Sequence, residues 1–297
     1  VQVSFSVDDA YEFFGGTVNA KHLFAYGTFD DNFDFDNGYV GKIQYGCSIV
    51  DPQSADQSRS NAIECDNDAT GSQNLPRTRP VLEGMTLIGP GTGATVNPLF
   101  QAGAQFRRAS EFSLRNSIIL GYPTGLIIQS DTTVSHWVNN RGSLLTNNIF
   151  YATSKMISVT AKKDGADSTK ALTYVNDAAN KDTVITNFAD AGLNDATAFA
   201  NPNFLPKSTT ARPNGGADYA TADAFFDKRT YRGAFGTINW LAEGWSTFDP
   251  QNKDYSTAGT GTSIGKHESI DYVRIFPNPA TTTSEIVFNV VEPAKYT

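Results

Sequence analysis

Two stretches of the sequence decide the fold: Asp8-Asp-Ala-Tyr-Glu-Phe-Phe-Gly-Gly-Thr-Val18 and Asp30-Asp-Asn-Phe-Asp-Phe-Asp-Asn-Gly-Tyr-Val40. They align without a gap at a spacing of 22 residues, and five of their eleven positions are identical. A repeat of roughly 20–25 residues with strand-like alternation is typical of one turn of a β-solenoid. We therefore predict that the two stretches form equivalent strands on adjacent coils.

Aromatic side chains recur at alternate positions of this repeat. Tyr11 and Phe13 share one face of the first strand, and Phe33 and Phe35 share the same face of the second. Neighbouring strands lie about 4.8 Å apart. The four rings are therefore expected to stack on one another in the core.

A second repeat lies further along the chain. Residues 114–119 align with residues 145–150 at a spacing of 31, and residues 82–87 fit the same frame more weakly. This register sets Asn116 over Asn147 and predicts a ladder of side-chain amides at a turn. Both repeats favour an all-β fold, a right-handed parallel β-helix.

The composition divides the chain into four parts. We expect the parallel β-helix to occupy residues 1–200 and an irregular, aromatic and glycine-rich C-terminal cap to occupy residues 201–250. A polar linker follows over residues 251–270, and residues 271–297 begin a further small domain. The chain opens within an apparent strand, so we also expect additional strands before Val1.

The charge balance restricts the partners of the protein. The chain has 31 acidic and 23 basic side chains, a net charge of −8. This excess of acid argues against nucleic acid and anionic membranes and favours cations as ligands. The apolar runs are too short to form a transmembrane segment.

The first repeat also concentrates acidic side chains. If 22 residues make one coil, Asp8 lies over Asp30, Asp9 over Asp31, and Glu12 over Asp34. Carboxylates stacked in this way repel one another, and either a bridging cation or the nearby Lys21, His22 and Lys42 would reduce the repulsion. Hard oxygen ligands favour Ca²⁺. We therefore predict a calcium site, and the alternative is a set of solvated surface carboxylates. The candidate metal ligands are Asp8, Asp9, Glu12, Asp30, Asp31, Asp34 and Asp36.

The chain has two cysteines, Cys47 and Cys65. In a secreted protein their spacing is compatible with a disulfide, which would contribute about 3 kcal/mol by loop closure. The alternative is two buried free thiols. We predict the disulfide.

Two parts of the sequence resemble known proteins. The stretch Tyr272-Val-Arg-Ile-Phe-Pro-Asn-Pro-Ala280 resembles the start of the C-terminal sorting domain of type IX secretion substrates in Bacteroidetes, a small β-sandwich that is incomplete here. Residues 8–249 resemble secreted β-helix proteins of the same bacteria, which carry segments similar to residues 8–16 and 231–236. The resemblance implies export by the type IX machinery and an extracellular or outer cell-surface location.

These features favour a non-catalytic protein for adhesion, matrix building or surface assembly, with surface polysaccharide or other surface proteins as partners. The alternative is a polysaccharide lyase or glycoside hydrolase of pectate-lyase-like fold. A lyase needs a basic side chain, and Arg107 and Arg108 are adjacent on an expected strand. The simpler explanation of either arginine is an exposed surface side chain or an ion-pair partner for Glu111. The sequence assigns no catalytic residue.

Overall fold

The computed structural model describes residues 1–140, 143–161, 165–208, 212–256, 270–276 and 285–290. The chain forms two compact units, which are described separately. The larger unit comprises residues 1–240 and 248–251, and the smaller one comprises residues 241–247 and 252–297.

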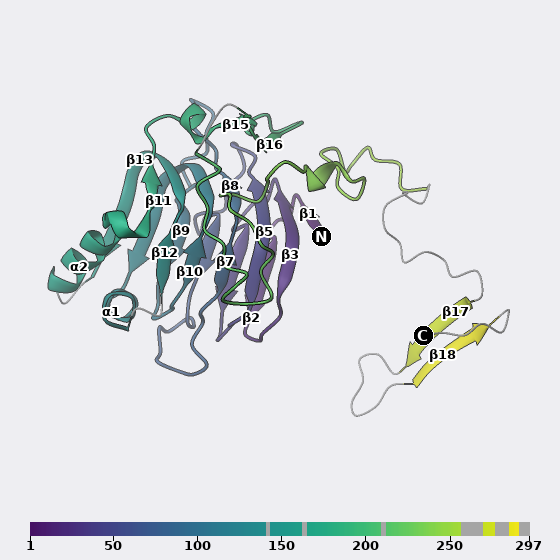
Figure 1. Cartoon of the computed structure of the whole chain (residues 1–297), viewed down its shortest axis with the longest axis horizontal. Helices are drawn as coiled ribbons and strands as arrows, with labels where there is room; N and C mark the ends of the chain where they lie inside the picture. The colour runs from purple at the N-terminus through teal and green to yellow at the C-terminus, as the bar shows by residue number, and fades with distance from the viewer. Residues whose placement is uncertain (141–142, 162–164, 209–211, 257–269, 277–284, 291–297) are drawn as a thin grey trace. The chain divides into compact units, whose positions relative to one another are not determined.

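The larger unit is a parallel β-helix, as the repeats predict (Figure 1). Every strand pair of its main sheet runs parallel, and the chain returns to each position one coil further on. The strands of this sheet are β1 (Gln2–Ser4), β2 (Tyr11–Phe14), β3 (Ala20–Tyr26), β4 (Phe33–Asp36), β5 (Lys42–Ile49), β6 (Ile63–Cys65), β7 (Val81–Glu83), β8 (Thr86–Ile88), β9 (Ala102–Phe106), β10 (Ser113–Arg115), β11 (Ile118–Gln129), β12 (Leu144–Thr146), β13 (Ile149–Thr160) and β14 (Thr183–Val184).

The strands form three stacks along the helix. The first stack contains the start of β5 with β7, β10 and β12. The second contains β1, most of β3, the end of β5, β8, the starts of β11 and β13, and β14. The third contains β2, β4, β6, β9 and the ends of β11 and β13.

A column of left-handed residues turns the chain from the first stack into the second. The strand registers place one such residue on each successive coil. All have positive φ, which costs least for Gly and Asn. They are His22, Tyr45, Gly84, Asn116, Asn147 and Lys181.

The predicted stacking of Asn116 over Asn147 is correct in position, but the predicted bond between their side-chain amides is wrong. One residue later, backbone N–H groups donate to side-chain oxygens of the following coil. The backbone N–H of Ser117 donates to Asn148 Oδ1, and the N–H of Asn148 donates to Asp182 Oδ1. The Asn116 side chain instead donates to Glu83 Oε1. The same amide also donates to the carbonyl of Ala217 at 2.7 Å, so Glu83 and the backbone of Ala217 hold it in place.

The aromatic core follows the predicted register. Tyr11 pairs with Phe33 and Phe13 with Phe35, and the ring centroids of the two pairs are 5.3 and 5.5 Å apart. The two rings of each pair are stacked nearly parallel, with interplanar angles of 12° and 11°. Identical alternation on consecutive coils therefore gives the core its continuous stack of rings.

The predicted disulfide is wrong, because Cys47 and Cys65 are buried free thiols. Cys47 lies in the second stack, between Phe24 and Thr86. Cys65 lies in the third stack, where it pairs with Phe35 and Phe106. The two cysteines therefore belong to different stacks, and burial raises the pKa of both thiols.

Short helices close the end of the stack opposite the N-terminus (Figure 1). They are α1 (Asp131–Ser135), the π-helix η1 (His136–Asn140), α2 (Gly165–Val175) and the 3₁₀ helix η2 (Ala178–Asn180). A further 3₁₀ helix, η3 (Phe188–Ala191), packs Phe188 edge-on to Tyr151. Ala171 and Val175 of α2 join the core, and Tyr174 packs edge-on to the buried Trp137 at 4.9 Å. These contacts cover the apolar interior of the last coils.

The chain after the last coil runs along the side of the β-helix. The antiparallel strands β15 (Leu193–Asp195) and β16 (Asn203–Pro206) come first. Residues 212–240, which we call the lateral segment, then cross in front of β5 and β7 (Figure 1). Within the range expected to form the cap, the lateral segment therefore covers a side of several coils, whereas the helices described above close the end.

Less of the remaining chain is described. The 3₁₀ helix η4 (Trp240–Ala242) follows the lateral segment, and β17 (Ile270–Phe276) and β18 (Glu285–Val290) pair antiparallel. Most of the predicted linker, and residues 277–284 and 291–297 of the predicted sorting domain, lie outside the described residues. Among the described residues, no helix has the length and apolar character needed to cross a bilayer.

Candidate functional site

The outer face of the third stack carries one carboxylate on each of three successive coils. Glu12 pairs with Asp34, and Asp34 pairs with Glu64. Their neighbours in sequence, such as Phe33 and Phe35, point into the core. Strand alternation thus directs the three carboxylates to the same outer face.

A second column of acidic and amide groups lies where the chain enters this stack. The Asp9 carboxylate accepts a hydrogen bond from the backbone N–H of Asp31 at 2.9 Å. Asp31 accepts one from the N–H of Asn61 at 2.5 Å, and Asn61 accepts one from the N–H of Ala102 at 3.1 Å. Each side chain therefore bonds to the backbone of the following coil. We call these three side chains the entry ladder.

Five of the seven predicted metal ligands come together. One group contains Asp8, Asp9 and Asp30, and the other contains Asp9, Glu12 and Asp34. Within each group the oxygen atoms available as ligands lie within 4.8 Å of one another. The two groups share Asp9 and form a continuous acidic site across two coils.

The other two predicted ligands lie outside these groups. Asp31 is buried, and its carboxylate is held by the entry ladder. The Asp36 carboxylate accepts a hydrogen bond from the N–H of Asn37 at 2.6 Å and caps the turn at the far end of β4. The repeat placed both residues on the correct coil but did not show which neighbours their oxygen atoms contact.

The acidic site holds its protons unusually tightly. Burial, together with the nearby carboxylates of Glu64 and Asp9, raises the pKa of Asp34 to about 9. Burial likewise raises the pKa of Asp9 to about 7, although its hydrogen bond from Asp31 acts in the opposite direction. Desolvation and like charges both disfavour the ionised form, so a positive ligand would be favoured here.

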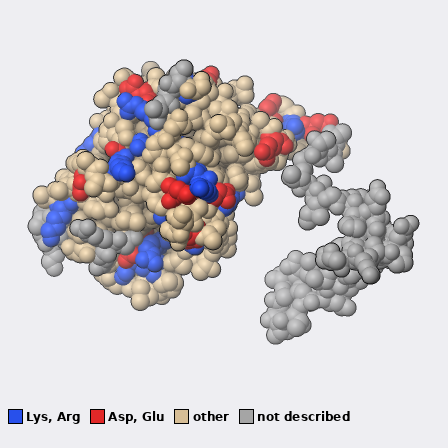
Figure 2. Space-filling model, viewed as in Figure 1, with Lys and Arg blue, Asp and Glu red and all other residues tan. Residues whose placement is uncertain are grey.

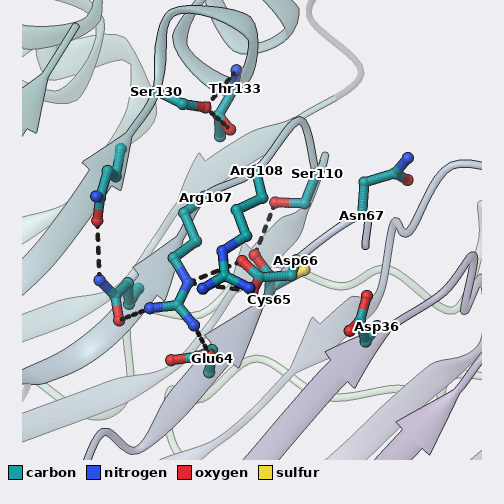
Figure 3. A network of polar contacts seen from close by, with 12 residues as sticks. Asp36, Glu64, Cys65, Asp66, Asn67, Arg107, Arg108, Ser110, Ser130 and Thr133 are labelled. Atoms are coloured by element: carbon teal, nitrogen blue, oxygen red, sulfur yellow. Dashed lines mark hydrogen bonds and ion pairs between the residues drawn. The ribbon is translucent and has the colours of Figure 1, made fainter. Parts of the chain in front are cut away.

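Two arginines follow β9, on the coil after Glu64, and Figure 3 shows them beside Glu64 and Asp66. Arg107 forms an ion pair with Glu64 and contacts Asp66 through Nε at 3.0 Å. Arg108 Nη1 lies 3.2 Å from the other oxygen of Asp66. The burial of Glu64 raises its pKa to about 7, and Arg107 limits this shift.

The alternative prediction for these arginines, an ion pair, is correct, but the predicted partner Glu111 is wrong. They pair with Glu64 and Asp66, and not with Glu111. Glu111 instead lies 3.8 Å from Arg77 and 3.6 Å from Arg79. Both arginines next to the acidic site are thus held by ion pairs.

Glu64 is the site residue that the sequence analysis missed. Ile63-Glu-Cys65 has the same apolar–acidic–apolar order as Phe33-Asp-Phe35, at a spacing of 30 residues. The longer loop between these coils obscures the match. A search for short alternating motifs with variable spacing would have identified it.

A hollow of about 640 Å³ lies further along the third stack. Ile127 of β11 lines it and pairs with Gln105, which follows Glu64 in the column of outer residues. Gln129, Ser158 and Thr160 add amide and hydroxyl groups to its walls. The outer face therefore changes from carboxylates to neutral polar groups along the helix.

Away from the acidic site, acidic and basic side chains lie next to one another on the surface. Figure 2 shows lysine and arginine beside aspartate and glutamate in small groups, with uncharged surface between them. The lateral segment forms such ion pairs with the β-helix. In one of them, Lys21 Nζ lies 2.6 Å from Asp227 Oδ1. In contrast, none of the five clustered carboxylates has such a pair among the described residues.

The comparison with known families agrees with this architecture. A family model described as a pectate-lyase like beta helix domain matches residues 1–199. The chain belongs to this family. The match to the pectate-lyase-like β-helix domain includes all the coils and the whole acidic site. Neither the search of curated proteins nor that of solved structures found a match.

Proposed function

We propose that this pectate-lyase-like β-helix is a non-catalytic extracellular protein for adhesion, matrix building or surface assembly, and that Ca²⁺ stabilises it at the acidic site. The observation that carries the proposal is the convergence of five carboxylates from two consecutive coils. A cation bound there would join the coils and remove the repulsion between like charges.

The ligand set fits calcium. All the ligands are carboxylate oxygens, which Ca²⁺ prefers over nitrogen or sulfur ligands. Two of these atoms, Asp30 Oδ1 and Asp34 Oδ1, are buried and have no hydrogen-bond partner among the described residues. A buried acceptor without a partner is costly, so a cation would supply the missing interaction.

The proposed location rests on the sequence. The segment from Tyr272 to Ala280 resembles the start of a type IX sorting domain, and the net charge of −8 favours cations over nucleic acid. We infer export by the type IX machinery of Bacteroidetes and attachment at the outer surface, where polysaccharides or other surface proteins would be the partners.

One observation favours a second candidate function, glycan hydrolysis. Asp34 and Glu64 are paired neighbours on the outer face, and their pKa values are raised to about 9 and 7. Glycoside hydrolases use one protonated and one ionised carboxyl group. In this case Asp34 would be the acid, and the hollow near Gln129 would hold part of the glycan.

Thermal unfolding with Ca²⁺ and with excess chelator tests the calcium proposal. We expect Ca²⁺ to raise the melting temperature of the wild type, with a stabilisation of about 2.7 kcal/mol at a concentration one hundred times Kd. The double variant Asp8→Asn, Asp30→Asn should lose this response. The exposed acids of Asp190→Asn, Asp195→Asn serve as the matched control and should retain it.

Identical melting in Ca²⁺ and in chelator would overturn the calcium proposal. A response that persists in Asp8→Asn, Asp30→Asn but disappears in the control variant would place the ion elsewhere.

A further inference from the structure

The outer face of the first stack is polar and lies beneath the lateral segment. The strand registers align four polar side chains in one column, Lys21, Gln44, Glu83 and Arg115. Ile43, Leu82 and Leu114 alternate with them and point into the core, so the column faces outward. The residues of the lateral segment that cross it form no helix or strand before η4. An irregular segment therefore covers a row of charged and amide side chains.

Two side-chain amides of the β-helix pair with the peptide backbone of the lateral segment. Gln44 Oε1 accepts a hydrogen bond from the N–H of Asp227 at 3.0 Å, and Gln44 Nε2 donates to the carbonyl of the same residue at 3.4 Å. Asn116 likewise accepts from the N–H of Ala217 at 2.9 Å and donates to its carbonyl at 2.7 Å. An amide side chain that binds both backbone groups of one residue recognises a polypeptide chain, whatever its sequence.

Two lysines of the same face bind carboxylates. Lys42 Nζ lies 2.5 Å from Asp223 Oδ2, and Lys21 forms the ion pair with Asp227 described above. The ring of Phe225 lies 5.0 Å from Lys21 Nζ, within the range of a cation–π contact. Acidic residues on either side of aromatic ones therefore fit the two lysines.

Arg115 contacts two aromatic rings, but one of its donors is unsatisfied. Its guanidinium lies over the rings of Tyr219 and Phe226, 4.1 and 4.8 Å from their centroids. Its Nε is buried and has no hydrogen-bond acceptor among the described residues. A buried donor without a partner is costly. The lateral segment therefore leaves one group of the face unsatisfied, and a carboxylate from another chain would satisfy it.

The outer face of the second stack is covered in a different way. Phe24 and Ile118 lie on its outward side and are buried, and Phe204 packs edge-on to Phe24 at 6.3 Å. Removal of this cover would expose apolar surface to water, which is costly. Over the first stack, in contrast, the ion pairs of Lys21 and Lys42 are partly exposed, and such pairs contribute little to stability. The chain over the first stack is therefore the easier part to release.

The releasable part is a loop with a closed base. The N–H of Gly216 donates to the carbonyl of Thr230 at 3.0 Å, and Arg229, just inside this base, is held by Glu83. Residues 217–228, which we call the strap, lie between these fixed points. Local opening would release the strap as a unit while the chain on both sides stays bound.

From these contacts we propose that the strap occupies an interaction face for a partner protein, and that an acidic, aromatic peptide segment of the partner binds there when the strap is released. The face consists of Lys21, Lys42, Gln44, Arg115 and Asn116. The strap keeps the face closed until a segment with more favourable contacts, such as a carboxylate at Arg115 Nε, competes with it. The face lies on the first stack, so the proposal is independent of calcium and of the acidic site on the third stack.

Hydrogen exchange of the wild type tests whether the strap opens. The N–H groups of Ala217 and Asp227 bond to the face, whereas that of Ala234 bonds to Thr86 Oγ1 in the cover of the second stack. We expect the first two to exchange at least tenfold faster than the third. Equal exchange at all three would overturn the proposal, because the strap would then open only together with the apolar cover.

A labelled peptide with the sequence of residues 219–228 tests the face itself. In one variant a Gly/Ser linker of equal length replaces these residues, and in a milder one Asp223→Asn, Asp227→Asn loosens the strap of an otherwise complete chain. Fluorescence anisotropy should show at least tenfold tighter binding to the linker variant, and at least threefold tighter binding to the milder one, than to the wild type, whose own strap competes. A peptide with Asn at both Asp positions should bind at least tenfold more weakly.

Substitutions on the face identify the groups that bind the peptide. In the loosened proteins, Lys21→Ala, Lys42→Ala and, separately, Gln44→Leu should each weaken binding at least fivefold. The exposed pair Lys155→Ala, Lys170→Ala removes the same charge elsewhere and should not. The proposal is overturned if neither loosened protein binds the peptide more tightly than the wild type, or if the Asn peptide binds equally well. Displacement of the peptide by polygalacturonate, with binding unchanged in Gln44→Leu, would also overturn it and identify an acidic polysaccharide as the ligand.

Discussion

The Asp9 carboxylate accepts a hydrogen bond from the backbone N–H of Asp31, 22 residues later, at 2.9 Å. In the same way, the Asp31 carboxylate accepts a hydrogen bond from the backbone N–H of Asn61. A shift of one residue would break these bonds and turn the aromatic side chains out of the core. The entry ladder therefore fixes the register of the coils at the point where they build the acidic site.

We predict that Asp31 acts chiefly as a hydrogen-bond acceptor. Asp31→Ala leaves the Asn61 N–H buried without a partner and should lower the free energy of unfolding by about 1–3 kcal/mol. Asp31→Asn keeps an acceptor and removes a carboxyl group whose pKa is raised by burial. This variant should be at least as stable as the wild type at neutral pH.

Urea unfolding of both variants checks this prediction. The surface variant Asp195→Ala is the control and should stay within about 0.5 kcal/mol of the wild type. Equal losses in Asp31→Ala and Asp31→Asn would show that the negative charge, and not the acceptor, is required.

The free energy of unfolding should fall as pH rises, whereas an ion-paired acid with a lowered pKa makes it rise. The pKa is raised to about 7 for Asp9 and to about 9 for Asp34. Between their ordinary value of 3.8 and these values, the folded protein binds more protons than the unfolded chain. Without Ca²⁺, the free energy of unfolding should therefore fall as pH rises from about 4 to 9.

Calcium should reverse much of this loss, because it binds the ionised carboxylates. Melting curves at several pH values, with Ca²⁺ and with chelator, measure the difference. Asp34→Asn should flatten the slope in chelator between pH 7 and 9, whereas Asp195→Asn should not. A melting temperature in chelator that rises over this range would contradict the prediction.

The sequence predicted the fold and part of the site because both depend on short alternating patterns. Tyr11 with Phe13 and Phe33 with Phe35 recur at one spacing, so their stacking and the approach of Glu12 to Asp34 follow directly. Glu64 was missed because the loop before it is longer.

The predictions that failed required knowing which strands lie in the same stack, and the sequence does not show this. Cys47 and Cys65 are close in sequence, but the loop between them carries the chain from the second stack to the third. The cap prediction failed for a similar reason. The aromatic and glycine-rich composition of residues 201–250 indicates that this stretch packs against the solenoid. It does not indicate whether the stretch covers the end of the solenoid or its side.

The lateral segment is anchored by a buried ion pair, and we predict that this pair controls its docking. Arg229 Nε lies 3.5 Å from Glu83 Oε1, and both side chains are 1% exposed. Arg229 also donates to the carbonyls of Tyr231 and Gly233 and lies over the ring of Tyr45. Arg229→Met leaves Glu83 without its cation and should cost about 3–5 kcal/mol.

Glu83→Gln in the same background should recover part of this loss, because it removes the unpaired charge. The exposed Lys228→Met is the control. Chemical unfolding gives the three free energies, and limited proteolysis reports whether residues 212–240 detach first. An Arg229→Met protein as stable as the control would mean that apolar contacts alone hold the lateral segment.

Arg107 bears on the choice between the two candidate functions. A lyase would need an unpaired base near the acidic site, but Arg107 contacts both Glu64 and Asp66, and these carboxylates raise its pKa. It therefore stays protonated at physiological pH. We predict that the protein releases no unsaturated, ultraviolet-absorbing sugar from acidic polysaccharides, with or without Ca²⁺.

The same incubations should be assayed for new reducing ends, because hydrolysis gives no ultraviolet signal. We expect none, as the non-catalytic proposal requires. Unsaturated product that disappears in Arg107→Ala, Arg108→Ala would establish a lyase. Reducing ends that disappear in Asp34→Asn but persist in Asp195→Asn would establish a hydrolase with Asp34 as its acid. Each variant should first be shown to be folded, because Arg107→Ala leaves Glu64 and Asp66 without their main cation.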